Sequence, residues 1–175
     1  MPVPSVGGLR PTADAQRETL FNWLQPHLPG ARVLDLYAGT GALGFEAASR
    51  GAREVWLVER DARASAQLEA NRERLGAAQV RIRGDDVARL LSQPPEGGPF
   101  DLVFLDPPFG QDRVAPTLAA LLAQGWLAPG ARVYAELESE IDPSFVVDAG
   151  WVIDRERTGG QARGMLLARG SGDAG

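Results

Sequence analysis

The chain has 175 residues, a formal net charge of −5 at pH 7 and 44% hydrophobic residues, which is the composition of an ordinary globular domain. It contains no cysteine, a single histidine and, among 18 basic residues, no lysine, which excludes disulfides, Cys/His zinc sites, thiol nucleophiles and lysine-based catalysis. An acidic chain is also a poor general binder of polyanions, so any contact with nucleic acid has to come from local groups of arginines.

The two ends of the chain differ in composition from its middle. Residues 1–11 hold three prolines and two glycines and are expected to form an extended arm. Residues 12–169 are expected to form one domain, and residues 170–175 a disordered tail. No apolar run reaches the roughly 18 residues of a membrane span, and no signal peptide is recognisable, so we expect a cytoplasmic protein that does not contact a membrane.

The domain begins with a predicted helix from Thr12, which Pro26 ends. Short apolar runs and longer amphipathic stretches then alternate. The predicted strands are residues 32–37, 54–59, 80–83, 100–105 and 131–136, and the predicted helices are residues 41–50, 62–75, 86–91 and 113–122. This alternation predicts an α/β fold with a mostly parallel central sheet. Residues 151–157 and 162–169, with a turn at 158–160, predict a C-terminal antiparallel hairpin.

A glycine-rich loop follows the first predicted strand. Residues 39–44 read Gly-Thr-Gly-Ala-Leu-Gly, a complete G-x-G-x-x-G, and Glu59 ends the second strand 20 residues beyond Gly39. In nucleotide-binding folds the glycines allow the backbone to approach the cofactor, and the acidic residue accepts hydrogen bonds from ribose hydroxyls. The pattern favours a nucleotide-type cofactor over a tight turn alone, but it does not choose the cofactor.

Asp35 narrows that choice. It lies in the middle of the first strand, where a buried carboxylate costs several kcal/mol unless it is paired. A dehydrogenase has no use for a carboxylate at this position, whereas S-adenosylmethionine carries an ammonium and a sulfonium centre near the glycine loop. The alternative is that Asp35 caps a neighbouring backbone group.

The motif Asp106-Pro107-Pro108-Phe109 follows the fourth strand, at the sheet edge where open α/β folds bind ligands. Two prolines fix the backbone, so the Asp106 carboxylate and the Pro107 carbonyl become a rigid pair of acceptors, which suits an exocyclic amine on a planar ring. Phe109 offers a face for that ring to stack on. The alternative is a rigid turn with a core phenylalanine.

Together these motifs resemble the S-adenosylmethionine-dependent amino methyltransferases. The segments 9–12 (LRPT) and 17–24 (RETLFNWL) resemble one branch closely, the bacterial small-subunit (16S) ribosomal RNA guanine-N2 methyltransferases called RsmD. The resemblance runs from about Leu9 to Arg169 and implies the Rossmann-like fold of S-adenosylmethionine methyltransferases. It also implies S-adenosylmethionine as the cofactor, with no metal ion.

The resemblance assigns roles to individual residues. The cofactor-binding residues would be Asp35, Gly39, Thr40 and Gly41 at the methionine portion, Glu59 at the ribose, Asp86 and Val87 at the adenine, and also Arg60 and Asp106. The catalytic residues would be Asp106, Pro107 and Phe109, and the substrate would contact Arg10, Pro108 and Phe109. The helix that contains Arg17, Thr19 and Asn22 would pack over the cofactor.

The expected activity is transfer of a methyl group to the N2 amine of a guanine in 16S ribosomal RNA, by a monomer that acts on an assembled particle. The D-P-P-F motif alone also fits methylation of adenine N6 in DNA or RNA, or of a protein glutamine. The glycine loop alone also fits an NAD-dependent oxidoreductase, and a non-catalytic RNA-binding protein could keep the same fold.

Overall fold

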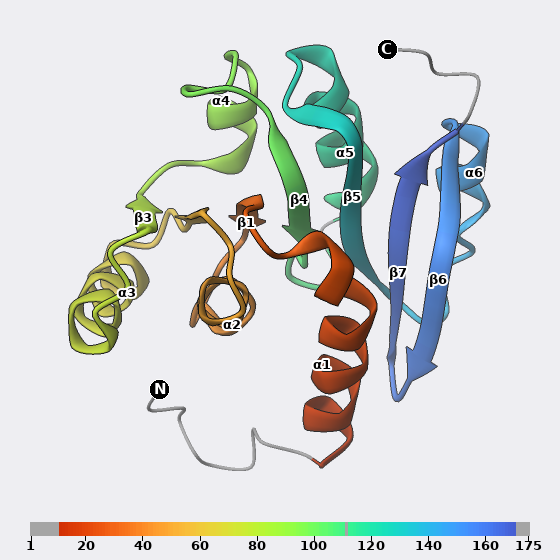
Figure 1. Ribbon diagram of the computed structural model, residues 1–175. Coiled ribbons are helices and arrows are strands. Elements are labelled where there is room, and N and C mark those ends of the chain that lie inside the picture. The colour runs from red at the N-terminus through yellow and green to blue at the C-terminus, as the bar shows by residue number, and fades with distance from the viewer. Residues whose placement is uncertain (1–10, 111, 171–175) are drawn as a thin grey trace.

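The computed structural model describes residues 11–110 and 112–170 (Figure 1). Arg10, most of the predicted arm and residues 171–175 of the predicted tail lie outside these ranges. The strands are β1 (Arg32–Leu36), β2 (Glu54–Val58), β3 (Val80–Arg83), β4 (Phe100–Leu105), β5 (Leu127–Glu138), β6 (Trp151–Gly159) and β7 (Ala162–Arg169). The helices are α1 (Pro11–Leu24), α2 (Ala42–Ser49), α3 (Ala62–Leu75), α4 (Val87–Leu91), α5 (Val114–Ala123) and α6 (Ser144–Asp148), with a short 3-10 helix at Gln25–His27.

All seven strands form one sheet in the order β3-β2-β1-β4-β5-β7-β6. The first five pair in parallel, whereas β7 pairs antiparallel with both β5 and β6. The predicted mostly parallel sheet with a C-terminal antiparallel hairpin is therefore confirmed. Because the chain extends from β1 to β2 on one side and later returns to β4 on the other, a crevice opens at the carboxyl ends of β1 and β4.

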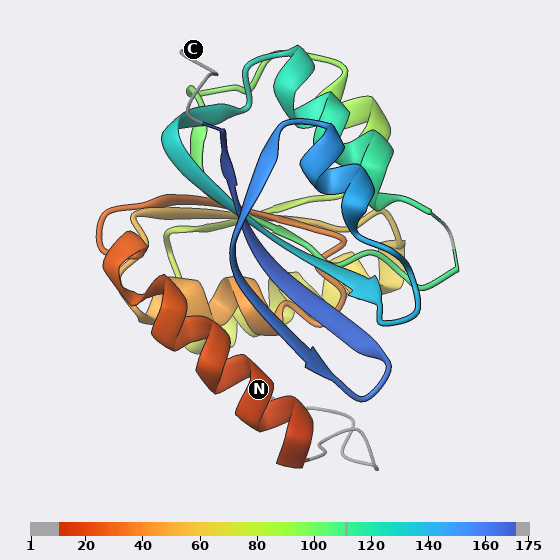
Figure 2. The same ribbon diagram turned by 90° about the vertical axis from the view of Figure 1, so that its right-hand side faces the viewer.

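Helices cover both faces of the sheet (Figure 2). On one face α1, α2 and α3 bury apolar side chains such as Phe21, Phe45 and Leu68 against the sheet. On the other face α4, α5 and α6 do the same with Leu91, Leu118 and Val146. None of the helices in the described ranges is long and apolar enough to cross a bilayer.

Several element boundaries differ from those expected. Helix α1 begins at Pro11, because proline is well suited to the first turn of a helix, where its missing N–H is not needed. Strand β5 begins at Leu127 and not at residue 131. Its pairing with β4 shifts register between Phe100 and Leu102, and this irregularity accommodates a proline and a glycine that would otherwise interrupt the strand. Strand β6 continues to Gly159, which moves the hairpin turn toward residues 160–161. Helix α6, with five residues, is too short to show a periodic pattern and was not expected.

Candidate active site

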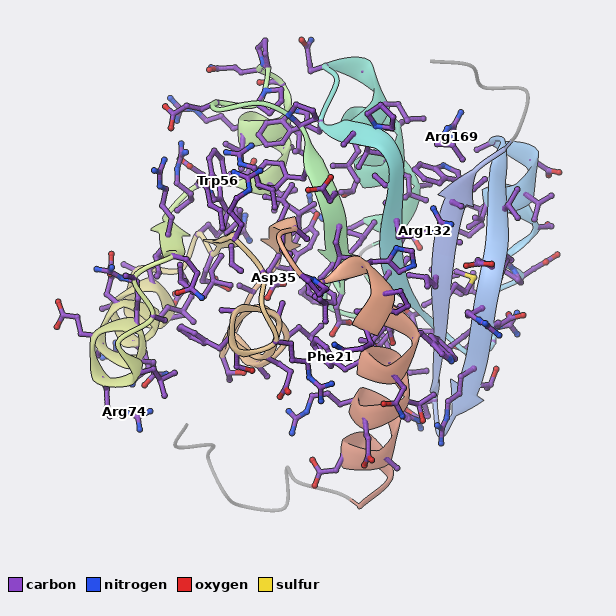
Figure 3. The ribbon with its side chains drawn as sticks, viewed as in Figure 1. Phe21, Asp35, Trp56, Arg74, Arg132 and Arg169 are labelled. Carbon is purple, nitrogen blue, oxygen red and sulfur yellow. The ribbon has the colours of Figure 1, made fainter. Side chains whose placement is uncertain are left out.

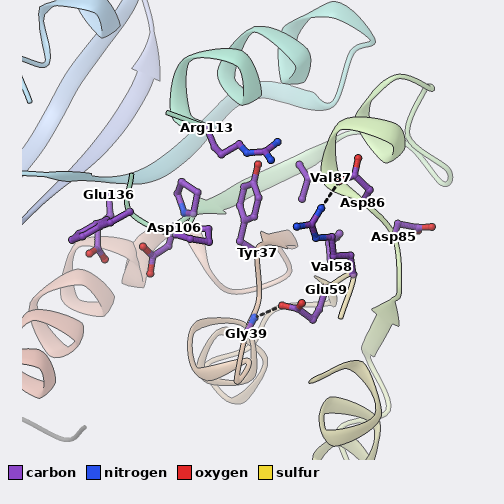
Figure 4. Close-up of a pocket in the computed structure, with 14 residues that line it drawn as sticks. Tyr37, Gly39, Val58, Glu59, Asp85, Asp86, Val87, Asp106, Arg113 and Glu136 are labelled. Carbon is purple, nitrogen blue, oxygen red and sulfur yellow. Dashed lines mark hydrogen bonds and ion pairs between the residues drawn. The ribbon is translucent and has the colours of Figure 1, made fainter. Parts of the chain in front are cut away.

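A cavity of about 440 Å³ lies in the crevice beyond the carboxyl ends of β1, β2 and β4 (Figure 4). Its volume is within the usual range for sites that bind small molecules and cofactors. The lining residues that matter here are Tyr37, Gly39, Glu59, Arg60, Asp85, Asp86, Val87, Asp106, Pro107, Pro108, Phe109, Arg113 and Glu136. The tertiary structure thus brings together the end of β2, the segment before α4 and the D-P-P-F motif, which are far apart in the sequence.

Glu59, at the end of β2, holds the glycine loop in place. Its Oε1 accepts a hydrogen bond from the Gly39 N–H at 3.0 Å (Figure 4). Its Oε2 accepts one from the Asp61 N–H at 3.0 Å. Each carboxylate oxygen retains a second lone pair that can accept from a ligand hydroxyl. Glu59 is therefore both part of the cavity wall and an anchor of the loop.

Asp35 lies inside the molecule, beside α2, and does not line the cavity (Figure 3). Its Oδ2 accepts a hydrogen bond of 3.0 Å from the Gly44 N–H in the first turn of α2. Burial raises the pKa of Asp35 to about 8, so the carboxyl is mostly protonated at neutral pH. This geometry matches the backbone-capping alternative. The contact with the methionine portion of the cofactor that the resemblance implies for Asp35 remains a prediction.

The packing and the backbone conformation of the glycine loop explain why two of its residues are glycines. A Cβ on Gly44 would lie 2.2 Å from Leu57 Cδ2, so only glycine lets α2 pack this closely on β2. Gly41, the residue just before α2, has a φ of +81°, a backbone conformation that favours glycine. Thr40 and Gly41 do not line the cavity, so their predicted cofactor contacts also remain predictions.

Asp86 and Val87 form the opposite wall. The Asp86 side chain caps α4 by accepting a hydrogen bond of 3.2 Å from the Arg89 N–H. Its other oxygen lies 3.8 Å from Arg60 NH1 (Figure 4). Both Asp86 and Arg60 remain substantially exposed, so this ion pair is weak and can rearrange around a ligand. The predicted Arg60, Asp86 and Val87 thus lie together at the cavity.

The D-P-P-F motif separates this cavity from a second one of about 240 Å³, lined by Phe109, Ile141 and Phe145 among others. Asp106 is largely buried, and burial, with the nearby Glu136 carboxylate as a second cause, raises the pKa of Asp106 to about 7. Phe109 is 47% exposed, so its ring is available for stacking and is not the core phenylalanine of the alternative interpretation.

Five cavity residues were not among those expected from the sequence, namely Tyr37, Val58, Asp85, Arg113 and Glu136. Tyr37 has a φ of +59°, unusual for a residue with a side chain, and its hydroxyl lies 3.1 Å from Thr117 Oγ1. Arg113 and Glu136 line both cavities. Glu136 carried a signal, since it is a carboxylate in a predicted buried strand, as Asp35 is. None of Arg17, Thr19 and Asn22 lines the cavity, so their predicted packing over the cofactor stays a prediction.

The charge of the cavity wall distinguishes between possible cofactors. Five carboxyl side chains and two arginines line it, the carboxyls being Glu59, Asp85, Asp86, Asp106 and Glu136. Such a wall favours a cationic ligand such as S-adenosylmethionine over the anionic pyrophosphate of NAD. In the part of the chain that the structure describes, no group of three or more acidic or histidine side chains is placed to hold a metal ion.

The sequence comparisons all point to one protein family. The model of the family described as Conserved hypothetical protein 95 matches residues 1–168. Ribosomal RNA small subunit methyltransferase D of Escherichia coli (strain K12) is 42% identical over 170 residues, which covers 97% of this chain and 84% of the relative. The Haemophilus influenzae protein of the same name is 38% identical and covers 91% and 83%.

Comparison with solved structures supports the methyltransferase fold. The yhhF protein of Escherichia coli superposes with a TM-score of 0.84 at 42% identity, covering 97% of this chain and 91% of that one. Magnesium protoporphyrin IX methyltransferase from Synechocystis, solved with bound S-adenosylmethionine, shares the fold with a TM-score of 0.71 at 18% identity, covering 90% and 80%. The expected Rossmann-like methyltransferase fold is therefore confirmed.

Proposed function

We propose that this chain, which belongs to the family of ribosomal RNA small subunit methyltransferase D, transfers a methyl group from S-adenosylmethionine to the exocyclic N2 amine of a guanine in 16S ribosomal RNA. Membership of the family makes the chain a methyltransferase of small-subunit ribosomal RNA. The observation that supports the finer assignment is the meeting of the D-P-P-F motif with Glu59, Asp86 and Val87 around one carboxylate-rich cavity.

The 440 Å³ cavity would hold the cofactor. Glu59 would accept from the ribose hydroxyls, and the edge formed by Asp86 and Val87 would hold the adenine. When bound, S-adenosylmethionine supplies an electrophilic methyl group on a positively charged sulfur. Carboxylates around the cavity would attract the cationic cofactor, and binding would align its methyl group with the D-P-P-F motif.

Asp106 and the Pro107 carbonyl would hold the two N–H groups of the target amine. This arrangement turns the nitrogen lone pair toward the methyl group, while Phe109 stacks on the base. As the N–C bond forms and the C–S bond breaks, N2 has to lose one proton. Asp106 can take that proton, because a pKa of about 7 is close to the operating pH. No covalent enzyme intermediate is required.

The direct test is incubation with labelled S-adenosylmethionine and small ribosomal particles from a strain that lacks this gene, followed by mapping of the methylated nucleotide. We expect label on one guanine, as N2-methylguanine. Label on adenine N6, or on a protein glutamine, would contradict the proposal and support the alternatives that share the D-P-P-F motif. The cytoplasmic location and the monomeric state stay predictions.

Replacing Glu59 by alanine should weaken the binding of S-adenosylmethionine and S-adenosylhomocysteine by roughly 1–3 kcal/mol, because a charged acceptor for the ribose and the anchor of Gly39 are both lost. The rate at saturating cofactor should change less. Calorimetric titration measures the binding. The matched control is Glu69→Ala, which removes an exposed carboxylate paired with Arg72 on α3. An unchanged dissociation constant for Glu59→Ala would place the ribose elsewhere.

We expect an assembled particle to be a far better substrate than protein-free rRNA. The net charge is −5, and many arginines are neutralised by acidic partners, as in the pairs Arg72–Glu69, Arg81–Glu96, Arg83–Asp85 and Arg163–Glu156. Non-specific affinity for RNA follows the number of phosphates neutralised, so binding to naked rRNA should be weak and should fall steeply with salt. A particle adds shape and protein contacts.

The measurement compares methylation rates of the particle and of naked 16S rRNA at low and at moderate salt. The particle reaction should be faster and less sensitive to salt. Equal rates on both substrates under both conditions would refute the argument from charge.

A further inference from the structure

Glu136 is a second carboxylate at the point where the methyl group would be transferred. It follows Ala135 in β5, which pairs in register with Leu105 of β4, and Asp106 follows Leu105. Residues that pair across adjacent strands have their side chains on the same face of the sheet, so Glu136 is beside Asp106. Figure 4 shows both side chains at the same end of the site. Glu136 lines both the 440 Å³ cavity and the 240 Å³ cavity, so it lies where the two meet.

The two carboxyl groups have few partners within the protein. The Tyr134 hydroxyl donates a hydrogen bond of 3.0 Å to Glu136 Oε2, and none of the ion pairs within residues 11–110 and 112–170 involves Asp106 or Glu136. Burial raises the pKa of both groups. Two close carboxyls in a partly buried site need hydrogen-bond donors, and a ligand that brings N–H groups would supply them.

We propose that Glu136 accepts a hydrogen bond from N1–H of the target guanine and thereby makes the site select guanine. This inference rests on the proposed function and adds the residue that recognises the base. Guanine presents three adjacent N–H donors, which are N1–H and the two N–H groups of N2; N1–H and one of the N2 groups lie on its Watson–Crick edge. The site offers three acceptors in the same region, which are Glu136, Asp106 and the Pro107 carbonyl.

The same arrangement disfavours the other amines that a D-P-P-F motif could hold. In adenine the atom beside the exocyclic amine is N1, an acceptor without a hydrogen. In a glutamine side chain the amide nitrogen and a carbonyl oxygen are bonded to the same carbon, so the group next to the amine is again an acceptor. Either would place a lone pair against Glu136, and a site built to accept a donor discriminates strongly against a ligand that lacks it.

The second cavity has the composition expected for the base. Phe109, Ile141 and Phe145 provide an apolar lining, and Glu136 lies at its junction with the cofactor cavity. A guanine unstacked into this space would direct its N2 amine toward the cofactor cavity while its N1–H faces Glu136. Glu136 would then orient the base, and Asp106 would contact the reacting nitrogen.

The test uses reconstituted particles in which the methylated guanosine, once mapped, is replaced by 2-aminopurine. This base keeps the N2 amine, but its N1 carries no hydrogen. The wild-type protein should prefer guanine over 2-aminopurine by about 100-fold or more in kcat/KM. In Glu136→Gln that ratio should fall by about tenfold or more, because the glutamine amide can donate a hydrogen bond to the unprotonated N1.

The matched control is Glu140→Gln, the same substitution at an exposed carboxylate four residues along the chain, which should leave the ratio within about threefold of the wild-type value. The cofactor dissociation constants and melting temperatures of all three proteins show whether they fold alike. A ratio that does not change in Glu136→Gln would overturn the proposal, as would a ratio that falls equally far in Glu140→Gln.

Two further results separate the possible failures. If the wild-type protein methylates 2-aminopurine as fast as guanine, the role of Glu136 is refuted even if the variant does not fold. If the wild-type protein does not methylate the guanine particle at all, it is the proposed function that fails.

Discussion

Replacing Asp106 by alanine will lower the rate of methyl transfer by roughly 10²–10³-fold, which corresponds to about 2.7–4 kcal/mol in the activation barrier. The reason is that the variant loses a positioned acceptor for the target amine, at the nitrogen where charge develops. Asp106 also has a pKa near neutrality, so the variant loses the group that takes the released proton. Single-turnover methylation of the particle at saturating cofactor measures the effect directly.

Binding of the cofactor should change little in the same variant, because Asp106 is assigned mainly to the target amine. Calorimetric titration with S-adenosylmethionine checks this separation. The control is Asp148→Ala, which removes an exposed carboxylate at the end of α6 and should leave the rate unchanged. A rate above about one tenth of the wild-type value in Asp106→Ala would show that the role assigned to this carboxylate is wrong.

Replacing Arg32 by alanine will lower the free energy of unfolding by about 3–5 kcal/mol, the usual cost of breaking a buried ion pair. Arg32 begins β1, and its side chain is 4% exposed. Its guanidinium binds Glu54 at 3.1 Å and donates to the carbonyl oxygens of Glu96 and Gly98. It also lies 4.1 Å from the centroid of the Phe100 ring. The variant would remove the donor that these three part-buried acceptors share, and Glu54 would keep the hydrogen bond from Trp56 Nε1.

Chemical denaturation followed by circular dichroism measures the loss. The matched control is Arg81→Ala, which breaks an exposed pair with the same loop, Arg81–Glu96, and should cost about 1 kcal/mol or less. Because domains of this kind are stable by only about 5–15 kcal/mol, Arg32→Ala should unfold at a much lower denaturant concentration. If both variants lose the same small amount of stability, the buried arginine does not hold the loop to the sheet.

Much of the candidate site could be predicted because its residues carry local signals. The structure gives a reason for two glycines of the loop, which is a left-handed backbone at Gly41 and the close packing of α2 on β2 at Gly44. Glu59 ends a strand at the expected spacing, and the D-P-P-F motif is rigid by its own covalent geometry. Each of these signals lies within a few residues of a strand end, and the parallel order of the strands brings those ends together.

Other parts of the site depend on contacts between distant segments. The role of Asp35 was open, and only the structure shows that its carboxyl bonds to the Gly44 N–H and is closed off from the cavity. The sequence alone does not show that Glu136 is part of the site, because only the pairing of β5 with β4 brings Glu136 next to Asp106. Tyr37 lines the cavity, and its backbone has a left-handed conformation that no pattern in the sequence predicted.

The amino-acid sequence by itself determined the α/β architecture, since periodicity and turn chemistry act over a few residues. It also predicted the D-P-P-F motif as the catalytic site, and its resemblance to a known family implied the cofactor class. The tertiary structure decided which carboxyl groups line the cavity, which ones are buried with a raised pKa, and which ones meet across neighbouring strands. Burial and the approach of like charges set those properties, and both depend on residues that are distant in the chain. For that reason Asp106 could be identified from its motif, whereas its partner Glu136 required the folded sheet.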